Sequence, residues 1–210
     1  MTKILIIVST LKDLVRYAGG TAARFCQEGS EVYAVAVHES ESADSQKACD
    51  ALGLKSCQYF GVARPLKTDP ELADRLASVY REIRPDRILT YSKHNDYSHP
   101  SRSAVRDYAM TAYQTASGAG YRDGRPVSPR QTPFFGLICS NEKPDLYLSI
   151  DSGFNSKKKA AIIEGISEEE ILADAVLNAA ECRRARTVPC YYAESFTAFG
   201  AAARTGRFIW

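Results

Sequence analysis

The chain lacks long hydrophobic runs, closely spaced cysteine pairs of the kind that bind structural zinc, and any strong excess of one charge. None of its apolar stretches approaches the roughly 20 residues needed to cross a membrane. The six cysteines, at positions 26, 49, 57, 139, 182 and 190, form no C-x-x-C pair, which argues against a structural zinc site and fits reduced thiols in the cytoplasm. The formal net charge of +2 gives no reason to expect nucleic acid or a membrane surface as a partner.

The N-terminal segment also lacks the features of an export signal. Its hydrophobic run, Ile4–Val8, is short and rich in β-branched residues, as in a buried strand. We therefore expect a cytoplasmic protein. Hydrophobic residues make up 45% of the sequence and charged residues 25%, as is usual for globular proteins. We expect a single domain over residues 1–210, with a long loop at about 114–133 that is rich in Gly, Pro, Arg and Ser.

Segments of strand type alternate with segments of helical spacing along the chain. Expected strands cover residues 4–8, 32–37, 57–60, 87–91, 134–139 and 146–150. Expected helices cover residues 18–27, 42–52, 69–83, 155–163 and 168–186, with another beginning at residue 101. Residues 9–17 are expected to form a loop, and the aromatic tail from Tyr191 is assigned to no element. This alternation predicts an α/β, Rossmann-like fold with a mainly parallel sheet and helices on both faces.

Polar side chains follow three of the expected strands. Asp13 lies in the loop after the first strand, His38 ends the second, and residues 93–102 follow the fourth. This last segment contains two of the chain's three histidines, His94 and His99. Because the carboxyl ends of parallel strands meet at one edge of a sheet, we expect these loops to share a crevice, where open α/β sheets bind their ligands.

Five segments, in this order, resemble motifs of the LmbE/PIG-L family. Gly19-Gly20-Thr21 resembles the Gly-Gly-Thr that follows the family's first motif, His-Pro-Asp-Asp-Glu. The others are residues 85–90, residues 95–102 for the His-Pro-Asp-His loop, residues 144–151 with 159–161, and residues 192–196. The family comprises zinc-dependent N-deacetylases with a Rossmann-like fold that act on amide-bearing amino sugars. The resemblance therefore implies a hydrolase that acts on C–N amide bonds, with zinc as its metal.

The chain departs from the family at the positions that carry the chemistry. Counted back from the Gly-Gly-Thr, the family's metal-binding histidine falls on Thr10, its general-base aspartate on Lys12, and its metal-binding aspartate on Asp13. In the second motif, the histidine that helps to stabilise the oxyanion is His99, and the metal-binding histidine falls on Arg102. Two of the three metal ligands and the base are therefore replaced.

Ligand number and charge argue against a zinc ion at the inherited position. A catalytic zinc usually has three protein ligands, and Asp13 alone remains of the set. Lys12 and Arg102 each bring a positive charge to the place of a dication, and like charges about 4 Å apart repel by about 4 kcal/mol at an effective dielectric constant of about 20. We therefore expect no cofactor, and we expect Arg102 or Lys12 to neutralise Asp13.

Three interpretations of the site remain. The first is a metal-independent hydrolase of the N-deacetylase or amidase type for a small, sugar-like or anionic substrate, with Asp13, Lys12, Arg102 and His99 as its catalytic group. In it, Lys12 and Arg102 stabilise an oxyanion and His99 is the acid or base. The second is a non-catalytic relative whose cationic pocket binds a small ligand or a partner protein. The third is a hydrolase with a rearranged metal site built from Asp13, His94 and His99, with His38 or Asp96 as a further ligand.

Neighbouring polar residues complete the expected site. The residues expected to bind the substrate are Arg16, His94, Asp96 and Tyr97. Several positions allow a structural role as readily: Arg102 in an ion pair with Asp13, His38 as a packed strand-end residue, and Asp151 and Glu194 as anchors of the C-terminal segment. We expect a small-molecule ligand, no nucleic acid and no membrane span, and the sequence leaves a homo-oligomer open.

Overall fold

The computed structural model describes residues 1–63, 69–93, 100–117, 132, 134–137, 144–161, 167–184 and 191–198. Within them, one sheet contains the strands β1 (Lys3–Val8), β2 (Glu31–Ala36), β3 (Ser56–Tyr59), β4 (Arg87–Tyr91), β5 (Phe134–Leu137), β6 (Leu146–Ile150) and β7 (Tyr192–Ala198). The helices are α1 (Leu11–Gln27), α2 (Ala43–Leu52), α3 (Pro70–Ile83), α4 (Pro100–Ser117), α5 (Ser152–Ala160) and α6 (Glu168–Arg184).

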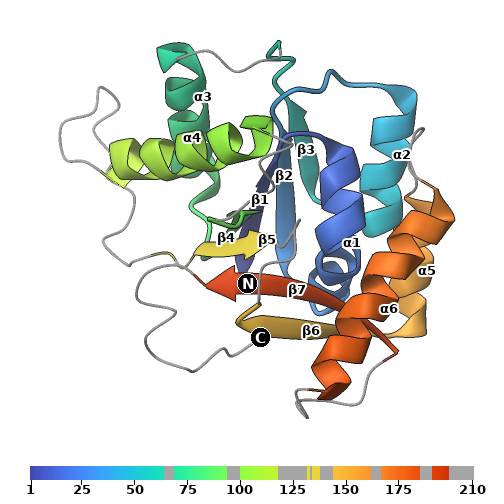
Figure 1. Ribbon diagram of the computed structural model, residues 1–210. Helices are drawn as coiled ribbons and strands as arrows, with labels where there is room; N and C mark the ends of the chain where they lie inside the picture. The colour runs from blue at the N-terminus through green and yellow to red at the C-terminus, as the bar shows by residue number, and fades with distance from the viewer. Residues whose placement is uncertain are drawn as a thin grey trace.

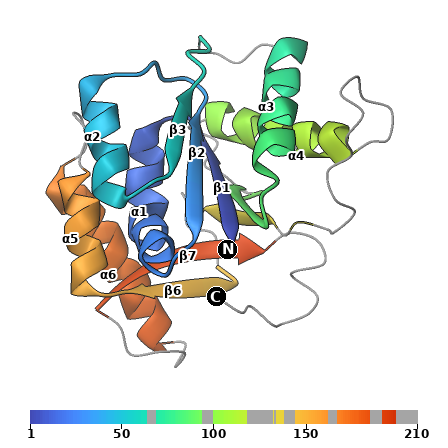
Figure 2. The ribbon, with the colours of Figure 1, turned by 180° about the vertical axis from the view of Figure 1, so that it is seen from behind.

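The sheet is mainly parallel, as the sequence predicted. Its strand order is β3-β2-β1-β4-β5-β7-β6, and β7 runs antiparallel to both of its neighbours. The expectation that the first strand lies beside the second and the fourth is confirmed, because β1 pairs in parallel with β2 and β4. Figures 1 and 2 show α1, α2, α5 and α6 on one face of this sheet and α3 and α4 on the other.

The core is centred on β1, the middle of the parallel part of the sheet. Every residue of Ile4–Val8 has an exposed fraction of 0%, which agrees with a β-branched strand covered on both faces. Helix α3 adds Leu72, Leu76 and Tyr80 to the core from the face of the sheet that α3 and α4 cover. The first turn of α3 is capped by Asp69, whose carboxylate accepts the Leu72 N–H at 3.2 Å. None of the described helices is long and apolar enough to span a membrane.

Residues 11–17 are helical, so the expectation of a loop over residues 9–17 is wrong for this part. The physical reason is an apolar stripe at helical spacing, Leu11, Leu14, Val15 and Ala18, all of them fully buried. The polar residues between them had suggested a loop. At the other end the expectation holds, because α1 ends at Gln27 and Gly29 follows with a positive φ of 86°.

The C-terminal tail supplies a strand that the sequence analysis did not assign. β7 enters the interior of the sheet between β5 and β6 and pairs antiparallel with both. Glu194, a buried glutamate, interrupts the apolar residues of β7, so the sequence of this segment does not have the pattern of a buried strand. Of the long loop expected at about 114–133, residues 114–117 form the end of α4, and the rest, apart from residue 132, lies outside the described residues.

A disulfide joins Cys49 of α2 to Cys57 of β3, so the expectation that all six cysteines are reduced is wrong for this pair. The two positions are separated by eight residues and close a turn around Gly53, which has a φ of 77°. Cys26 is a free thiol, and burial raises its pKa to about 11 although Lys157 opposes the shift. Cys26 is therefore a weakly reactive thiol near neutral pH.

We expect the disulfide to be detected by differential alkylation of the folded, purified protein. Before reduction, iodoacetamide should leave Cys49 and Cys57 unmodified, and after reduction with dithiothreitol it should modify both once the chain is unfolded. Peptide mass spectrometry reads each position separately. Cys57→Ser should also lower the midpoint of thermal unfolding by a few degrees, because a short cross-link removes entropy from the unfolded chain. Full alkylation of both cysteines in denaturant without reductant would contradict the bond.

Candidate functional site

The strand order reverses between β1 and β4, and the candidate site lies at this point. From β1 the chain continues outward to β2 and β3, and it then returns to β4 on the other side of β1 and continues to β5. Such a switch point leaves a crevice at the carboxyl ends of the two central strands. Helix α1 follows β1 directly, and α4 follows β4 beyond residues 94–99. The first turns of these two helices carry Asp13 and Arg102.

Asp13 is buried, with an exposed fraction of 8%, and both of its carboxylate oxygens are engaged. The Arg102 guanidinium donates from Nη2 to Oδ1 at 2.7 Å and from Nε to Oδ2 at 3.1 Å. The Tyr91 hydroxyl also donates to Oδ2, at 2.5 Å. Two parallel N–H···O bonds between arginine and a carboxylate form a strong, orienting arrangement. The ion pair that we expected between Arg102 and Asp13 is present, whereas a catalytic role for either residue stays a prediction.

Tyr91 is a site residue that the sequence analysis missed. It is the last residue of β4 and is fully buried, and its hydroxyl accepts the Ser9 N–H at 2.6 Å while it donates to Asp13. The hydroxyl therefore links the end of β4 to the end of β1 and to the first turn of α1. Its place at the end of a central strand was the available signal, but it was counted among the core residues of the strand.

Glu39 is a second residue that was missed. Thr10 precedes α1 as its N-cap residue, but its side chain makes no capping hydrogen bond. The Glu39 carboxylate, in the loop after β2, instead accepts the Leu11 N–H at 2.6 Å. A carboxylate is favourable at a helix N-terminus, where unpaired N–H groups carry partial positive charge. The start of α1 is thus fixed from β2 as well as from β4.

The guanidinium of Arg16 is balanced within the protein. Its Nε donates to Asp174 Oδ2 of α6 at 2.6 Å, and Nη1 lies 4.0 Å from Glu170 Oε1. Burial is the largest effect and lowers the pKa of Arg16, but the hydrogen bond with Asp174 and the nearby charges of Tyr17, Asp174 and Glu170 together outweigh it, so the pKa lies above the ordinary value. Tyr17 presents its ring to two cations, with the guanidinium carbons of Arg16 and Arg102 at 5.2 and 5.5 Å from its centre. Substrate binding by Arg16 stays a prediction.

Lys12 differs from the other two cations near the site. Its side chain is partly exposed, and in the part of the chain that the structure describes its ammonium group has no carboxylate or other hydrogen-bond partner. Arg102 is paired with Asp13, and Arg16 with Asp174. The positive charge of Lys12 is therefore balanced by no described residue.

Residues 94–99, which contain both central histidines, are not among the described residues. His94, Asp96, Tyr97 and His99 all lie outside the described residues, so their expected roles stay predictions. The flanking residues are described: α4 begins directly after the segment, and before it the carbonyl of Lys93 accepts a hydrogen bond from Nη1 of Arg106 at 2.9 Å.

Three polar residues whose roles were open have structural contacts. His38 donates from Nδ1 to the Val62 carbonyl at 2.7 Å, since a carbonyl oxygen can only accept. Asp151 caps α5 by accepting the Phe154 N–H at 2.9 Å. Glu194 is buried, with an exposed fraction of 2%, and pairs with a lysine of α5. These contacts support packing and anchoring roles.

The donor set at the inherited metal position does not fit zinc. Thr10 offers a hydroxyl, which is a poor ligand, and the Arg102 guanidinium has no lone pair and keeps its proton in proteins. Both oxygens of Asp13 already accept hydrogen bonds. Among the residues that the structure describes, no group of three His, Cys, Asp or Glu side chains is arranged to hold a metal ion.

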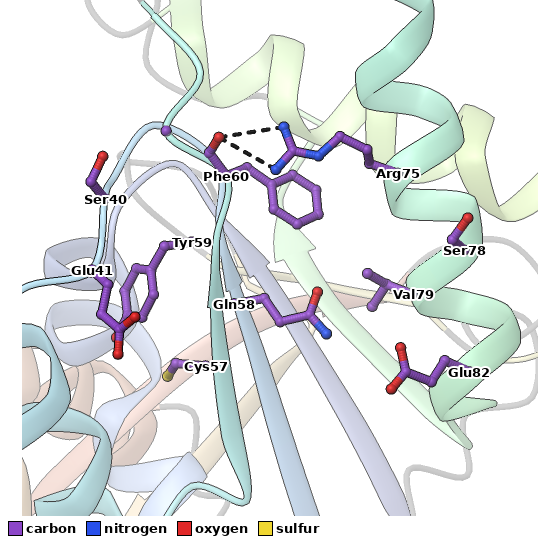
Figure 3. A pocket seen from close by; sticks show the side chains of 11 residues that line it. Ser40, Glu41, Cys57, Gln58, Tyr59, Phe60, Arg75, Ser78, Val79 and Glu82 are labelled. Atoms are coloured by element: carbon purple, nitrogen blue, oxygen red, sulfur yellow. Dashed lines mark hydrogen bonds between the residues drawn. The ribbon is translucent and has the colours of Figure 1, made fainter.

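A separate, open hollow of about 650 Å³ lies at the edge of the sheet, between β3 and α3 (Figure 3). Gln58, Phe60 and Arg75 are among its lining residues. The Arg75 guanidinium lies 4.0 Å from the centre of the Phe60 ring and donates to the Phe60 carbonyl at 3.4 Å. None of the predicted site residues that the structure describes lines this hollow, so it is distinct from the cluster around Asp13.

Removing the cation beside Asp13 tests the weight of the ion pair. We expect Arg102→Met to lower the free energy of unfolding by about 3 kcal/mol, because it leaves a buried carboxylate without its partner. Urea unfolding near neutral pH measures the change. The control is Lys47→Met, which removes an exposed pair with Asp44 and should cost less than about 1 kcal/mol.

A double variant completes this experiment. Asp13→Asn combined with Arg102→Met should lose less stability than the sum of the two single changes, because the removed groups interact directly. Strictly additive losses, or a loss for Arg102→Met no larger than that for Lys47→Met, would show that the pair contributes little.

Comparison with known proteins identifies related enzymes. No protein-family model matches the chain. The 4-oxalmesaconate hydratase of Pseudomonas putida is 25% identical over 203 residues, covering 80% of this chain and 74% of the hydratase. A 1D-myo-inositol 2-acetamido-2-deoxy-alpha-D-glucopyranoside deacetylase of Kineococcus radiotolerans is 35% identical over 77 residues, which are 36% of this chain and 21% of that enzyme.

Solved structures share the fold over nearly the whole chain. The 4-carboxy-2-hydroxymuconate hydratase of Pseudomonas putida superposes with a TM-score of 0.80 and 22% identity, covering 95% of this chain and 97% of that one. The N,N'-diacetylchitobiose deacetylase of Pyrococcus horikoshii gives a TM-score of 0.76 and 16% identity over 94% of this chain and 84% of that one. The chain therefore has the fold of these hydratase and deacetylase structures, and its curated relatives include a deacetylase of the kind that the LmbE/PIG-L resemblance indicated.

Proposed function

We propose that the protein is a metal-independent enzyme that adds water to a small, negatively charged substrate, with amide hydrolysis as the leading reaction. The observation that carries the proposal is the contact between Arg102 and Asp13. A guanidinium lies 2.7 Å from the carboxylate that remains of the inherited metal site, so the chain itself supplies the positive charge there. A fixed cation in a buried site stabilises negative charge that develops on a substrate oxygen.

The cations divide the work in this proposal. Arg102 is oriented by two bonds to Asp13 and by the neighbouring ring of Tyr17, so its direction is fixed before a substrate arrives. Lys12 has no partner among the described residues and attracts the anionic group of the substrate. A protonated lysine accepts no proton, and both oxygens of Asp13 are engaged, so we assign water activation to His99.

The relatives support this class of chemistry without naming the substrate. Hydratases and deacetylases both bring water to a small substrate, and one hydratase is named for a carboxy-substituted molecule. Lys12, which has no partner among the described residues, suits a carboxylate. Hydration of a carboxylated substrate is therefore the reaction to examine beside amide hydrolysis.

One observation favours a second function, that of a ligand-binding protein without turnover. The position of the family's general base is occupied by Lys12, and Asp13 cannot replace that base while Arg102 and Tyr91 hold both of its oxygens. Such a site retains the means to bind an anion, whereas the family's general base is absent from its usual position.

Metal content tests the metal-independent part of the proposal. We expect purified wild-type protein to contain well below one zinc per chain by plasma mass spectrometry. The variant Thr10→His/Lys12→Asp/Arg102→His restores two nitrogen ligands and removes both cations, so we expect it to bind about one zinc. About one zinc in the wild type, lost in Asp13→Ala, would overturn the proposal and favour the rearranged site with His94 and His99.

Turnover tests the choice between enzyme and binding protein. Screening should use N-acetylated amino sugars and small unsaturated carboxylates, with product detection by mass spectrometry. For any substrate that turns over, we expect His99→Ala to lower kcat at least about a hundredfold with little change in KM, because acid–base catalysis contributes about that much. Lys12→Met should mainly raise KM. If His99→Ala retains wild-type turnover, that histidine has no part in the mechanism. Ligand binding that depends on Lys12, with no turnover of any screened compound, would support the binding protein instead.

A further inference from the structure

A buried ion pair between Lys158 and Glu194 meets α1 in the middle of its length. The amide N–H of Gly20 donates to Glu194 Oε1 at 2.9 Å, and that of Thr21 donates to Oε2 at 2.7 Å. The ammonium of Lys158 donates to the carbonyl of Arg16 at 2.6 Å and to Glu194 Oε1 at 2.8 Å. The side chains of the pair are 1% and 2% exposed, so water does not compete for these bonds.

The two sides of this contact are the two ends of one helical hydrogen bond. In a regular α-helix the N–H of Gly20 would donate to the carbonyl of Arg16, four residues earlier. Here the N–H has a carboxylate partner from β7, and the carbonyl has an ammonium partner from α5. The ion pair thus binds the donor and the acceptor that belong to one step of the α1 hydrogen-bond ladder.

Two glycines make room for the pair. A β-carbon at Gly19 would lie 3.2 Å from Cγ of Lys158, and one at Gly20 would lie 2.8 Å from Cγ2 of Ile150 on β6. Distances below 3.0 Å require atoms to move, so α1 approaches β6 this closely because it has no side chain at Gly20. The Gly-Gly sequence and the charged pair are therefore parts of one arrangement.

We propose that Lys158 and Glu194 are positioning residues for the crevice: through their bonds to the α1 backbone at Arg16, Gly20 and Thr21, they fix the direction of Leu11–Tyr17, which carries Lys12 and Asp13. The inference deepens the proposed function, because it takes this part of α1 to be the site. Leu11–Tyr17 lies directly before the backbone groups that bind Glu194, and Figure 1 shows α5 and α6 beside α1 on the same face of the sheet. Its own anchors are Arg102, Tyr91 and Glu39, so a change in its direction would alter the bonds of Asp13.

The polarity of the pair distinguishes a positioning role from simple attraction between charges. Glu194 faces two N–H donors, and Lys158 faces a carbonyl oxygen. Exchanging the two charges would place an ammonium against N–H groups and a carboxylate against a carbonyl. The exchanged pair could still attract itself, but it would repel α1 on both sides. An ordinary buried ion pair, in contrast, has no such dependence on direction.

The experiment measures the helix and the site separately, and it needs no substrate. The single variants are Lys158→Met and the milder Glu194→Gln, which keeps an acceptor oxygen. The charge-swapped variant is Lys158→Glu/Glu194→Lys. The matched control is Lys157→Met, which removes an adjacent, exposed lysine that contacts Gln27 Oε1 at 3.4 Å. Amide hydrogen exchange of individual α1 residues and the NMR signal of the Arg102 Nε–H, which bonds to Asp13, are recorded for each.

We expect Lys158→Met and Glu194→Gln to accelerate exchange of the Gly20 and Thr21 amides at least about tenfold more than that of amides in β1, and to shift the Arg102 Nε–H signal. The charge-swapped variant should restore neither the amide exchange rates nor the Arg102 signal of the wild type. Lys157→Met should change neither of these two quantities. The inference is overturned if the single variants accelerate amide hydrogen exchange equally in α1 and β1 or leave the Arg102 signal unchanged. It is also overturned if the charge-swapped variant restores the wild-type exchange rates. Because no readout depends on turnover, these results stand whether or not the protein proves to be an enzyme.

Discussion

A carboxylate buried at the carboxyl edge of a parallel sheet needs a positive partner, and at Asp13 this need organises the site. Asp13 is the one metal ligand of the family motif that the sequence retains, and here it holds a guanidinium. The exchange changes what the position can do. A metal ion offers an open coordination place and makes its bound water acidic, whereas a guanidinium offers fixed N–H donors and a charge that does not titrate. With Arg102 beside Asp13, this position can offer a ligand a fixed charge and N–H donors.

The same helix is fixed by charged contacts along its first half. Asp13 contacts α4 through Arg102, Arg16 contacts α6 through Asp174, and the backbone at Gly20 contacts Glu194 of β7. Apolar residues of similar volume could fill the space of Lys158 and Glu194, but they would leave the N–H of Gly20 without its carboxylate and the carbonyl of Arg16 without its ammonium. Each contact has a direction, so together they specify the orientation of α1 more closely than apolar packing does.

The sequence predicted most of the fold because hydrophobic periodicity is a local property. The central strands and the placement of β1 between β2 and β4 follow from that periodicity and from the rules for parallel connections. The pairing of Arg102 with Asp13 was also within reach, because the family motifs put both positions in one site and a buried carboxylate requires a cation.

What the sequence did not predict depends on contacts between distant segments. Leu11–Tyr17 is helical because its apolar stripe meets the core and Glu39 caps it from another strand. The sequence did not indicate β7 because Glu194 interrupts its apolar residues, and the burial of Glu194 depends on its ion pair with Lys158 of a distant segment. Cys49 and Cys57 pair because α2 and β3 lie side by side, and no spacing rule indicates such a bond. Tyr91 lies in an apolar strand segment like a core residue, and only the contacts of its hydroxyl group with Asp13 and Ser9 make it part of the site.

The difference between an enzyme and a binding protein at this site comes down to one proton acceptor. Lys12, Arg102 and Asp13 serve both functions equally, since attraction of an anion and stabilisation of an oxyanion need the same charges. Addition of water needs in addition a group that takes its proton. Arg102 and Lys12 are cations, and the Tyr91 hydroxyl donates its proton to Asp13. Both Asp13 oxygens already accept hydrogen bonds, from Arg102 and from Tyr91. A working enzyme therefore needs a base from outside the Asp13 cluster, and His99 is the base that we propose.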